Sequence, residues 1–391
     1  MTENVAVLGS TGSIGRQTLE VISDLNQSQE NLYNVVALTC ATNLDLLLDQ
    51  AEKYNPSFLC VKDPEGLTEL EARASSSINC LQGGEGLAKI ASLSELGHVV
   101  NALVGFAGLE PTLAAIEADN RLLLANKESL VVGGRLVTDR LQDTEADIIP
   151  IDSEHSALFQ ALQAGGEEEV ARLILTASGG AFRDSPREKI IDAGPQEALD
   201  HPNWSMGHRI TVDSATMVNK GFEVIEAHWL FGVDYKDIQV VIHEQSSVHS
   251  LVEFVDGSVV GQLGPPDMRG PIQYALTCPR RKESLAHKMD WNRPFQLDFR
   301  PVSKGRYPAY ELLLEAGRKG GTRPAALNSA DEELVDAFLE ERISFGAIAR
   351  GLQMVYDRLD PVENPDLNDL KETDRQAREQ VRRLVGDDLL E

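Results

Sequence analysis

Cysteine is scarce in this chain, and the few cysteines are scattered. The 391 residues include only four, at Cys40, Cys60, Cys80 and Cys278. None forms a C-x-x-C pair, and nothing in their spacing resembles a zinc cluster. This pattern suits a protein of the reducing cytoplasm.

Long apolar runs are also missing. No stretch approaches the about 20 consecutive apolar residues that a membrane-spanning helix requires. The N-terminal sequence M-T-E-N-V-A-V-L-G enters a predicted strand at once, without the basic region and apolar block of an export signal. We therefore expect a globular cytoplasmic protein with no membrane partner.

Basic residues are outnumbered. The 36 Lys and Arg stand against 62 Asp and Glu, which gives a net charge of −26. Because a polyanion requires a basic face, this composition argues against a nucleic-acid partner. Residues 201–220 differ, since Arg209 and Lys220 outweigh Asp213 there and two histidines accompany them. This segment predicts a locally positive pocket for a small anion.

The first 150 residues alternate short β-rich runs with helical patterns. Helical spacing covers 16–25 and 44–54. We predict strands at 4–9, 33–40, 57–62, 98–104, 122–125 and 147–151. This alternation predicts an α/β fold with a parallel sheet covered on both faces.

The pattern changes after residue 151. A strand at 172–180 and a strand, connection and hairpin over 238–263, turning at Asp256-Gly257, predict an α+β domain. The proline-punctuated segment 279–308 is interpreted as a linker, and helical patterns follow it, most clearly at 324–339. The predicted domains are therefore 1–151, 152–278 and 309–391, with 279–308 as the linker.

The sequence G-S-T-G-S-I-G, residues 9–15, lies between a predicted strand and a predicted helix. Its glycines allow a tight turn, and the helix N-terminus offers free N–H groups to a pyrophosphate. The alternative is a glycine turn with a purely structural role. The second strand ends T-C-A-T-N (39–43), without the acid that binds the ribose of NAD. Thr42 and Asn43 can hydrogen-bond a 2′-phosphate, so NADP is favoured.

Two carboxylates follow the strand at 147–151, in the sequence I-I-P-I-D-S-E-H. If the chain is still extended there, Asp152 and Glu154 lie on one side and repel unless a cation separates them. The alternative is that this sequence caps a helix beginning S-E-H-S-A-L.

Three further motifs carry polar residues. In L-L-L-A-N-K-E, Lys127 follows a strand and can stabilise an oxyanion, although a solvated Lys–Glu pair is the alternative. In H-P-N-W-S-M-G (201–207), Trp204 suggests a lid, or a side chain folded onto its own domain. Ser214, Asn219 and Lys220 are residue types that bind phosphate, with Glu223 on the same helical face, unless the set is surface decoration.

Taken together, these motifs resemble the 1-deoxy-D-xylulose-5-phosphate reductoisomerase family from Val5 to the C-terminal helices. The matching sequences are G-S-T-G-S-I-G, L-L-A-N-K-E-S-L-V, P-I-D-S-E-H, H-P-N-W-S-M-G, V-D-S-A-T-M-V-N-K-G and Q-L-G-P-P-D-M-R. The resemblance implies a Rossmann-like NADP-binding domain, a central α+β catalytic domain and a C-terminal helical domain. It also implies rearrangement and NADPH-dependent reduction of 1-deoxy-D-xylulose 5-phosphate to 2-C-methyl-D-erythritol 4-phosphate, in isoprenoid precursor synthesis, by a homodimer.

The resemblance also implies site residues. The catalytic residues would be Lys127, Asp152, Glu154 and Glu223, and the three acids would bind the metal. Substrate contacts would come from Ser153, Glu154, Ser178, His201, Trp204, Met206, Ser214, Asn219, Lys220 and Glu223. NADPH contacts would come from Thr11, Gly12, Ser13, Ile14, Ala41, Asn43, Asn126, Glu128 and Gly207.

The acids Asp152, Glu154 and Glu223 include no thiol or imidazole, so they suit Mg²⁺ or Mn²⁺ rather than zinc. The chain departs from the family at Ala41-Thr42, where many members carry a glycine and a basic residue, and at Glu244, where proline is frequent.

Two other functions fit parts of the sequence. A Rossmann dehydrogenase acting on an amino-acid semialdehyde would share the glycine loop, but it would not require Glu223 together with the D-S-E acids. A non-catalytic NADP-binding regulator would have no reason to combine these acids with Lys127 and Lys220. A metal requirement separates the dehydrogenase from the reductoisomerase. For the expected homodimer, we predict that the strands within 238–263 lie at the interface.

Overall fold

The computed structural model describes residues 2–28, 32–201, 203–204, 206–387 and 389–390. The chain divides into two compact units. The first contains residues up to Ser129, Arg135–Ser156 and Asp267–His287. The second contains Leu130–Gly134, Ala157–Pro266 and the chain from Lys288 onward. This division into two units is a different partition of the chain, and the three predicted domains with their linker remain a prediction.

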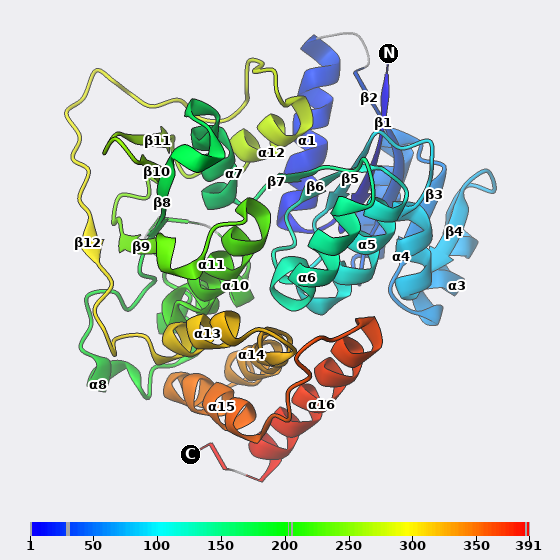
Figure 1. Ribbon diagram of the computed structural model, residues 1–391. Coiled ribbons are helices and arrows are strands. Elements are labelled where there is room, and N and C mark those ends of the chain that lie inside the picture. The colour runs from blue at the N-terminus through cyan, green and yellow to red at the C-terminus, as the bar shows by residue number, and fades with distance from the viewer. Residues whose placement is uncertain (1, 29–31, 202, 205, 388, 391) are drawn as a thin grey trace. The chain divides into compact units, whose positions relative to one another are not determined.

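The first unit is built on a seven-stranded sheet in which every paired neighbour is parallel. The spatial order is β4-β3-β2-β1-β5-β6-β7 (Figure 1). The strands are β1 Glu3–Leu8, β2 Tyr33–Thr39, β3 Phe58–Val61, β4 Asn79–Gln82, β5 His98–Asn101, β6 Arg121–Leu124 and β7 Ile148–Pro150. The predicted parallel sheet, and with it the α/β fold class, is confirmed.

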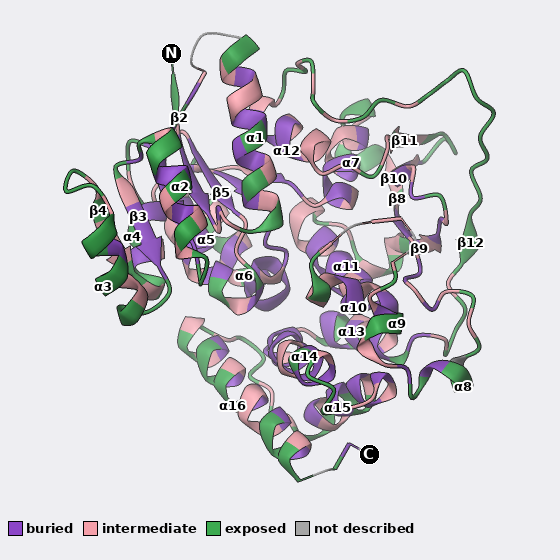
Figure 2. Ribbon diagram, turned by 180° about the vertical axis from the view of Figure 1, so that it is seen from behind, coloured by how far each residue is buried: buried purple, intermediate pink, exposed green. Residues whose placement is uncertain are grey.

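The helices of this unit connect consecutive strands. They are α1 Ser13–Ser28, α2 Leu44–Tyr54, α3 Pro64–Arg73, α4 Gly83–Ala91, α5 Leu109–Glu117 and α6 Glu128–Gln142, joined by the later α12 Arg269–Thr277. The chain runs outward from β1 to β4, then resumes at β5 on the other side of β1. Because such crossovers are right-handed, α1–α3 cover one face and α4–α6 the other. The central strands between them are buried, as Figure 2 shows for β5, whereas the edge strand β4 contains no buried residue.

The second unit contains a mixed five-stranded sheet, in the order β11-β10-β8-β9-β12. Its strands are β8 Val170–Ala177, β9 Ile238–Ile242, β10 Val248–Phe254, β11 Val259–Leu263 and β12 Arg300–Pro301. Only the β8–β9 pair is parallel. β10 and β11 form the predicted hairpin, and Gly257 adopts a φ of +82° at its turn.

Helices make up the rest of this unit. They are α7 Ser153–Ala161, which begins in the first unit, then α8 Arg187–Ile190, α9 Pro195–Ala198, α10 His208–Thr216, α11 Val218–Phe231, α13 Pro308–Lys319, α14 Arg323–Leu339, α15 Phe345–Arg358 and α16 Leu367–Gly386. Short 3₁₀ turns lie at Gly105–Gly108, Leu162–Ala164, Glu167–Glu169 and Tyr235–Asp237. Among the described residues, no helix combines the length and the apolar character that crossing a membrane demands.

Helix α11 is buried on both sides. Val224 and Ala227 belong to the core beneath the five-stranded sheet, whereas Phe222 and Ile225 belong to the core formed with α13–α16. A Cβ at Gly221 would lie 2.8 Å from Leu313 of α13, so the glycine permits this close packing. The C-terminal helices therefore share a hydrophobic core with α10 and α11.

Candidate active site

The glycine loop connects β1 to α1. Gly9 has a φ of +81°, and a Cβ there would lie 2.6 Å from the carbonyl oxygen of Ala102. A Cβ on Gly15 would lie 2.3 Å from the Gly9 oxygen. Gly12 and Ser13 are exposed at the start of α1, whose first turn contains no acid. The loop thus presents backbone N–H groups that fit an anionic pyrophosphate.

The segment after β2 is exposed. Ala41, Thr42 and Asn43 all lie at the surface, between β2 and α2. The Asn43 side chain accepts a hydrogen bond from the Leu46 N–H at 3.1 Å and caps α2. A hydroxyl and an amide are therefore available here, and Asn43 also stabilises the helix.

Asn126 and Glu128 organise the loop that follows β5. The buried Asn126 amide donates to the carbonyl oxygens of Leu103 and Gly105 at 3.0 and 3.1 Å. Glu128 accepts from the Gly105 N–H at 3.1 Å. A Cβ at Gly108 would lie 2.1 Å from the Asn126 side chain. These two predicted NADPH residues thus also have a structural role.

A buried ion pair lies at the carboxyl ends of β6 and β7. Lys127 Nζ is 2.5 Å from Asp152 Oδ2, and His155 Nδ1 is 3.1 Å from Asp152 Oδ1. Burial alone would raise the pKa of Asp152. The positive charge of Lys127 and the hydrogen bond from His155 outweigh burial and hold the pKa well below its ordinary value. Asp152 is therefore a carboxylate at neutral pH.

The two acids of the D-S-E sequence are arranged by a helix start. The chain is already helical from Ser153, so the alternative of an extended chain at 152–154 is wrong and the predicted helix start is confirmed. Asp152 accepts from the Glu154 N–H at 3.2 Å. The Ser153 hydroxyl donates to the Glu154 carboxylate at 2.5 Å. The chain is helical rather than extended here because the Asp152 side chain accepts a hydrogen bond from a free N–H in the first turn of α7.

The loop after β8 and helix α10 bring three predicted substrate residues together in the second unit. Ser178 Oγ is 2.9 Å from His201 Nε2 and 3.3 Å from Ser214 Oγ. A Cβ at Gly180, whose φ is +68°, would lie 2.5 Å from the Ser214 carbonyl oxygen. Glycine at this position allows the loop to reach α10.

His201 is held as a neutral donor. Its Nδ1 accepts from the N–H groups of Asn203 and Trp204, at 3.2 and 3.0 Å. Burial, and then the charge of Arg183, lower the pKa of His201. The neutral ring therefore carries its proton on Nε2, where it donates to Ser178.

The residues of α11 that are predicted to bind phosphate are not simply exposed surface residues. Lys220 and Glu223 are 4% and 1% exposed. Lys220 donates to Glu223 one helical turn later, and Asn219 Nδ2 donates to the other Glu223 oxygen at 2.6 Å. A left-handed residue, Met217 with a φ of +63°, turns the chain sharply between α10 and α11. This corner places a buried ammonium and carboxylate just after Ser214.

Trp204 packs on its own unit. It is half-buried, and its ring centroid lies 6.1 Å from that of His249 on β10. Burial lowers the pKa of His249 to about 4, so this neighbour is neutral. Met206 is half-buried, and Gly207 caps α10. Pro202 and Ser205 of the same motif lie outside the described residues.

Sequence reasoning did not single out His155, Arg183 or His249 for a role. His155 had a signal, because it lies three residues after Asp152 in a predicted helix. Arg183 had none, because it contacts the Ser178 carbonyl oxygen from an irregular turn five residues later, and His249 had none, because its contact with Trp204 is distant in sequence.

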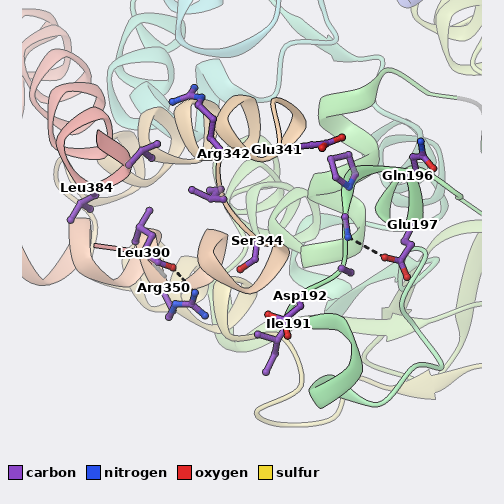
Figure 3. A pocket seen from close by; sticks show the side chains of 15 residues that line it. Ile191, Asp192, Gln196, Glu197, Glu341, Arg342, Ser344, Arg350, Leu384 and Leu390 are labelled. Atoms are coloured by element: carbon purple, nitrogen blue, oxygen red, sulfur yellow. Dashed lines mark hydrogen bonds between the residues drawn. The ribbon is translucent and has the colours of Figure 1, made fainter. Parts of the chain in front are cut away.

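A cavity of about 1070 Å³ lies elsewhere in the second unit (Figure 3). Residues 191–197 and 341–344 line it, together with Arg350, Leu384, Val385 and Leu390. None of the predicted site residues is among these described lining residues, so the cavity is separate from the candidate active site.

Three family profiles match this chain. Residues 5–134 match "1-deoxy-D-xylulose 5-phosphate reductoisomerase", residues 148–231 match its "C-terminal domain", and residues 263–380 match "DXP reductoisomerase C-terminal domain". The 1-deoxy-D-xylulose 5-phosphate reductoisomerase of Halothermothrix orenii is 46% identical over 387 residues, which cover 99% of this chain and 100% of that protein. The corresponding protein of Gloeobacter violaceus is 46% identical over 386 residues, covering 98% and 97%.

Solved structures agree with these relatives. A crystal structure of DOX-P reductoisomerase in complex with NADPH, fosmidomycin and magnesium superimposes with a TM-score of 0.91 at 40% identity and covers 98% of each chain. The Zymomonas mobilis enzyme in complex with NADPH gives 0.89 at 38% identity, covering 98% of this chain and 99% of that one. As its motifs predicted, the chain belongs to the 1-deoxy-D-xylulose 5-phosphate reductoisomerase family of oxidoreductases.

Proposed function

We propose that this chain catalyses the reaction of its family, the NADPH- and metal-dependent conversion of 1-deoxy-D-xylulose 5-phosphate to 2-C-methyl-D-erythritol 4-phosphate. One observation within the first unit carries this proposal. The glycine loop follows β1, Lys127 follows β6 and Asp152 follows β7, so all three lie at the carboxyl edge of one parallel sheet. Ligands of open α/β sheets bind at this edge.

NADPH fits the residues at this edge. Gly12 and Ser13 at the exposed start of α1 would hold the pyrophosphate, with Thr11 and Ile14 beside them. The exposed hydroxyl of Thr42 and amide of Asn43, next to Ala41, would contact the 2′-phosphate. The bound nicotinamide supplies the hydride that reduces the rearranged aldehyde. Asn126, Glu128 and Gly207 are the other residues that would contact NADPH.

A divalent cation fits the three acids. Asp152 is ionised by its surroundings, and Asp152, Glu154 and Glu223 offer only oxygen ligands. Hard oxygen ligands suit Mg²⁺, which a relative contains, and Mn²⁺ equally well. When bound, such an ion polarises a carbonyl and a neighbouring hydroxyl of the substrate. Lys127 would hold Asp152 in place and present its ammonium to developing negative charge on the substrate.

The substrate phosphate fits the second unit. Lys220 supplies a buried positive charge, and the Ser178 and Ser214 hydroxyls and the Asn219 amide supply hydrogen-bond donors. His201 would donate through Nε2, the nitrogen that now faces Ser178. Ser153 would contact a substrate hydroxyl. Binding energy from the phosphate, which does not react, positions the carbons that do.

Trp204 and Met206 would cover the bound substrate. The Trp204 ring packs near His249, and the backbone N–H groups of Asn203 and Trp204 donate hydrogen bonds to His201. A movement of this segment over the substrate would exclude water from the aldehyde formed during the reaction.

We further propose that the chain is a cytoplasmic homodimer. The edge hairpin β10–β11 exposes Val255 and Val259, at 68% and 52%. The segment before β12 exposes Trp291 at 69% and Phe295 at 44%. Large apolar side chains exposed near a sheet edge are typical of an interface. A size-exclusion experiment on Trp291→Ser tests the interface, and an unchanged dimer would remove this segment from it.

Product analysis tests the proposed reaction. The purified protein is incubated with 1-deoxy-D-xylulose 5-phosphate, NADPH and Mg²⁺, and the products are separated by chromatography and identified by mass spectrometry and ¹³C NMR, which distinguishes the carbon skeletons. We expect a phosphate ester heavier than the substrate by two hydrogens, identical to authentic 2-C-methyl-D-erythritol 4-phosphate. A reduced product with the unrearranged carbon skeleton would instead indicate a simple dehydrogenase.

A further inference from the structure

The segment 298–307, which belongs to the predicted linker, is fixed along the edge of the five-stranded sheet of the second unit (Figure 1). Its strand β12 pairs with β9. The Asp298 carbonyl oxygen accepts a hydrogen bond from His243 at 2.9 Å, and the Phe299 ring stacks on the same imidazole. At the other end, Tyr307 is buried and directly precedes α13. The segment is therefore anchored at both ends.

The loop that follows β8 consists of turns over residues 178–185. We call it the substrate loop, because it begins with the predicted substrate residue Ser178. Gly179 and Gly180 have φ angles of +81° and +68°, so the chain bends twice directly after Ser178. Carbonyl groups in such a loop lack the regular partners of a helix or a sheet, and they require donors from elsewhere.

The end of the 298–307 segment supplies donors to the substrate loop. One guanidinium nitrogen of Arg306 donates to the carbonyl oxygens of Phe182 and Ser185, at 2.6 and 2.5 Å. The Tyr307 hydroxyl donates to the Gly179 carbonyl oxygen at 3.4 Å. Phe182 and Tyr307 are both only 6% exposed, so these contacts lie largely away from water. Because hydrogen bonds from a charged donor are the stronger ones, Arg306 is the main support of the loop.

A second set of contacts reaches the loop through ion pairs. Arg300 of β12 lies 2.6 Å from Glu244 and 3.1 Å from Asp184. Arg183 lies 2.9 Å from Asp184 and donates to the Ser178 carbonyl oxygen at 3.0 Å. The side chains of Arg300, Glu244 and Asp184 are 48%, 37% and 60% exposed, so water screens their charges and these pairs contribute little. The hydrogen bonds from the end of the segment therefore outweigh them.

The same end of the segment leads into the helices on the other side of the proposed phosphate site. Helix α13 begins at Pro308 and packs on α11, where a Cβ at Gly221 would lie 2.8 Å from Leu313. Gly221 directly follows Lys220, the predicted phosphate-binding cation. Arg306 therefore connects the substrate loop to the helix pair that contains Lys220.

We propose that Arg306 and Tyr307 are positioning residues, which hold the substrate loop so that the Ser178 hydroxyl is in place for the substrate phosphate. This inference rests on the proposed function, in which Ser178 contacts that phosphate. Ser178 lies 2.9 Å from His201 and 3.3 Å from Ser214, so a displaced loop would separate these three side chains. A loop that adopts this arrangement only part of the time lowers the apparent substrate affinity by that fraction.

Arg306→Met tests the proposal, because it removes the guanidinium and keeps an unbranched side chain. The control is Lys304→Met, which removes the same charge two residues earlier, from an exposed position. Tyr307→Phe removes one hydroxyl and nothing else. It provides the same test, with a smaller expected effect, if Arg306→Met does not fold.

Steady-state kinetics give the first readout. For Arg306→Met we expect the KM for 1-deoxy-D-xylulose 5-phosphate to rise on the order of 10-fold, from the loss of hydrogen bonds to a charged group. The kcat should change less, because the phosphate does not react. Tyr307→Phe should raise KM about 2–3-fold, and Lys304→Met should leave both constants at their wild-type values.

Hydrogen exchange without substrate gives the second readout. In Arg306→Met, exchange should quicken at the amides of Gly180, Arg183 and Ser185, whose hydrogen bonds lie within the substrate loop. Exchange in α14, a core helix of the same unit, should not change. This difference separates a loosened loop from a destabilised fold.

Three results would overturn the proposal. The first is equal KM values and equal loop exchange in Arg306→Met and Lys304→Met. The second is exchange that quickens as much in α14 as in the loop, which would mean that Arg306 stabilises the whole unit. The third is faster loop exchange with an unchanged KM, which would mean that the loop does not position Ser178.

A wild type that turns over no substrate would count against the proposed function instead. The positioning of Ser178 is then tested with inorganic phosphate as the probe. Arg306→Met should raise its dissociation constant and Lys304→Met should not, and equal constants in the two variants would overturn the inference.

Discussion

Asp152 is a carboxylate that its neighbours keep ionised inside the protein. Lys127 and His155 contact its two oxygens at 2.5 and 3.1 Å. A buried acid with a depressed pKa is prepared to bind a cation without first losing a proton. Glu223 is also buried, at 1% exposure, and its two carboxylate oxygens accept hydrogen bonds from Lys220 and Asn219.

Glu154→Gln tests the predicted metal ligand. The amide keeps the size of the side chain and its hydrogen bond with Ser153, but it removes the charge that a hard cation requires. We expect turnover to fall about 10–100-fold or more, which is the loss typical of disturbing a metal site. NADPH affinity should stay unchanged, since the glycine loop is intact. Turnover close to that of the wild type would remove Glu154 from the metal site. The matched control is Glu168→Gln, an exposed acid in the same unit as α10 and α11.

Lys220→Met tests the predicted phosphate site. The methionine fills a similar volume but removes the buried charge that faces Glu223. We expect the KM for 1-deoxy-D-xylulose 5-phosphate to rise more than kcat falls, because phosphate binding is a remote contact. Steady-state kinetics measure both. Lys236→Met, at an exposed position beyond α11, is the control, and equal KM values in the two variants would contradict the assignment.

At the scale of elements, local patterns predicted most of the first unit. Apolar strands separated by helical spacing identified β1, β2, β3, β5, β6 and β7, with ends within a few residues of those observed. The chain between 63 and 97 was not assigned, and it forms α3, β4 and α4. Strand β4, N-C-L-Q, has neither the length nor the alternation of a recognisable strand. It is a strand because it pairs with β3, and single-sequence patterns do not contain that information.

Gly15→Ala tests the glycine loop as an element. The added methyl group would lie 2.3 Å from the Gly9 oxygen and 2.5 Å from the Ser10 Cα, both backbone atoms. We expect a loss of stability of about 1–3 kcal/mol from this overpacking, together with weaker NADPH binding. Thermal unfolding and NADPH titration measure the two effects. In contrast, Gly84→Ala, on the exposed face of α4, should leave both unchanged. A Gly15→Ala protein that binds NADPH normally would show that the loop adapts.

The site was predicted as residue types rather than as contacts. The family resemblance implied Ser178, His201 and Ser214, and the structure places the Ser178 hydroxyl within hydrogen-bonding distance of the other two side chains. The sequence motifs could not show that the Asn126 side chain stabilises a neighbouring loop by hydrogen bonds. Its partners, Leu103 and Gly105, lie on another strand–helix connection. The chemical roles of Ser178, His201, Ser214 and Asn126 remain predictions.

At the scale of the whole molecule, chain order and spatial organisation differ. Residues 267–287, including α12, return to the first unit after more than a hundred residues of the second. Residues 331–391 contain 17 Asp and Glu against 8 Lys and Arg. Most of them lie in α14–α16, where Arg378 contacts Glu332 at 2.6 Å and Asp374 at 2.8 Å. The charged C-terminal region is therefore made largely of packed helices that share a core with α10 and α11.

The central claim is that this chain reduces its substrate with NADPH and requires a divalent cation to do so. The most direct measurement follows the loss of NADPH absorbance on adding 1-deoxy-D-xylulose 5-phosphate, with Mg²⁺, with Mn²⁺, and with excess EDTA. A parallel trace with NADH tests the segment at Ala41-Thr42. We predict oxidation of NADPH that EDTA abolishes and added metal restores. Oxidation that continues at the same rate in EDTA, or no oxidation by the folded, metal-supplemented protein, would contradict the account.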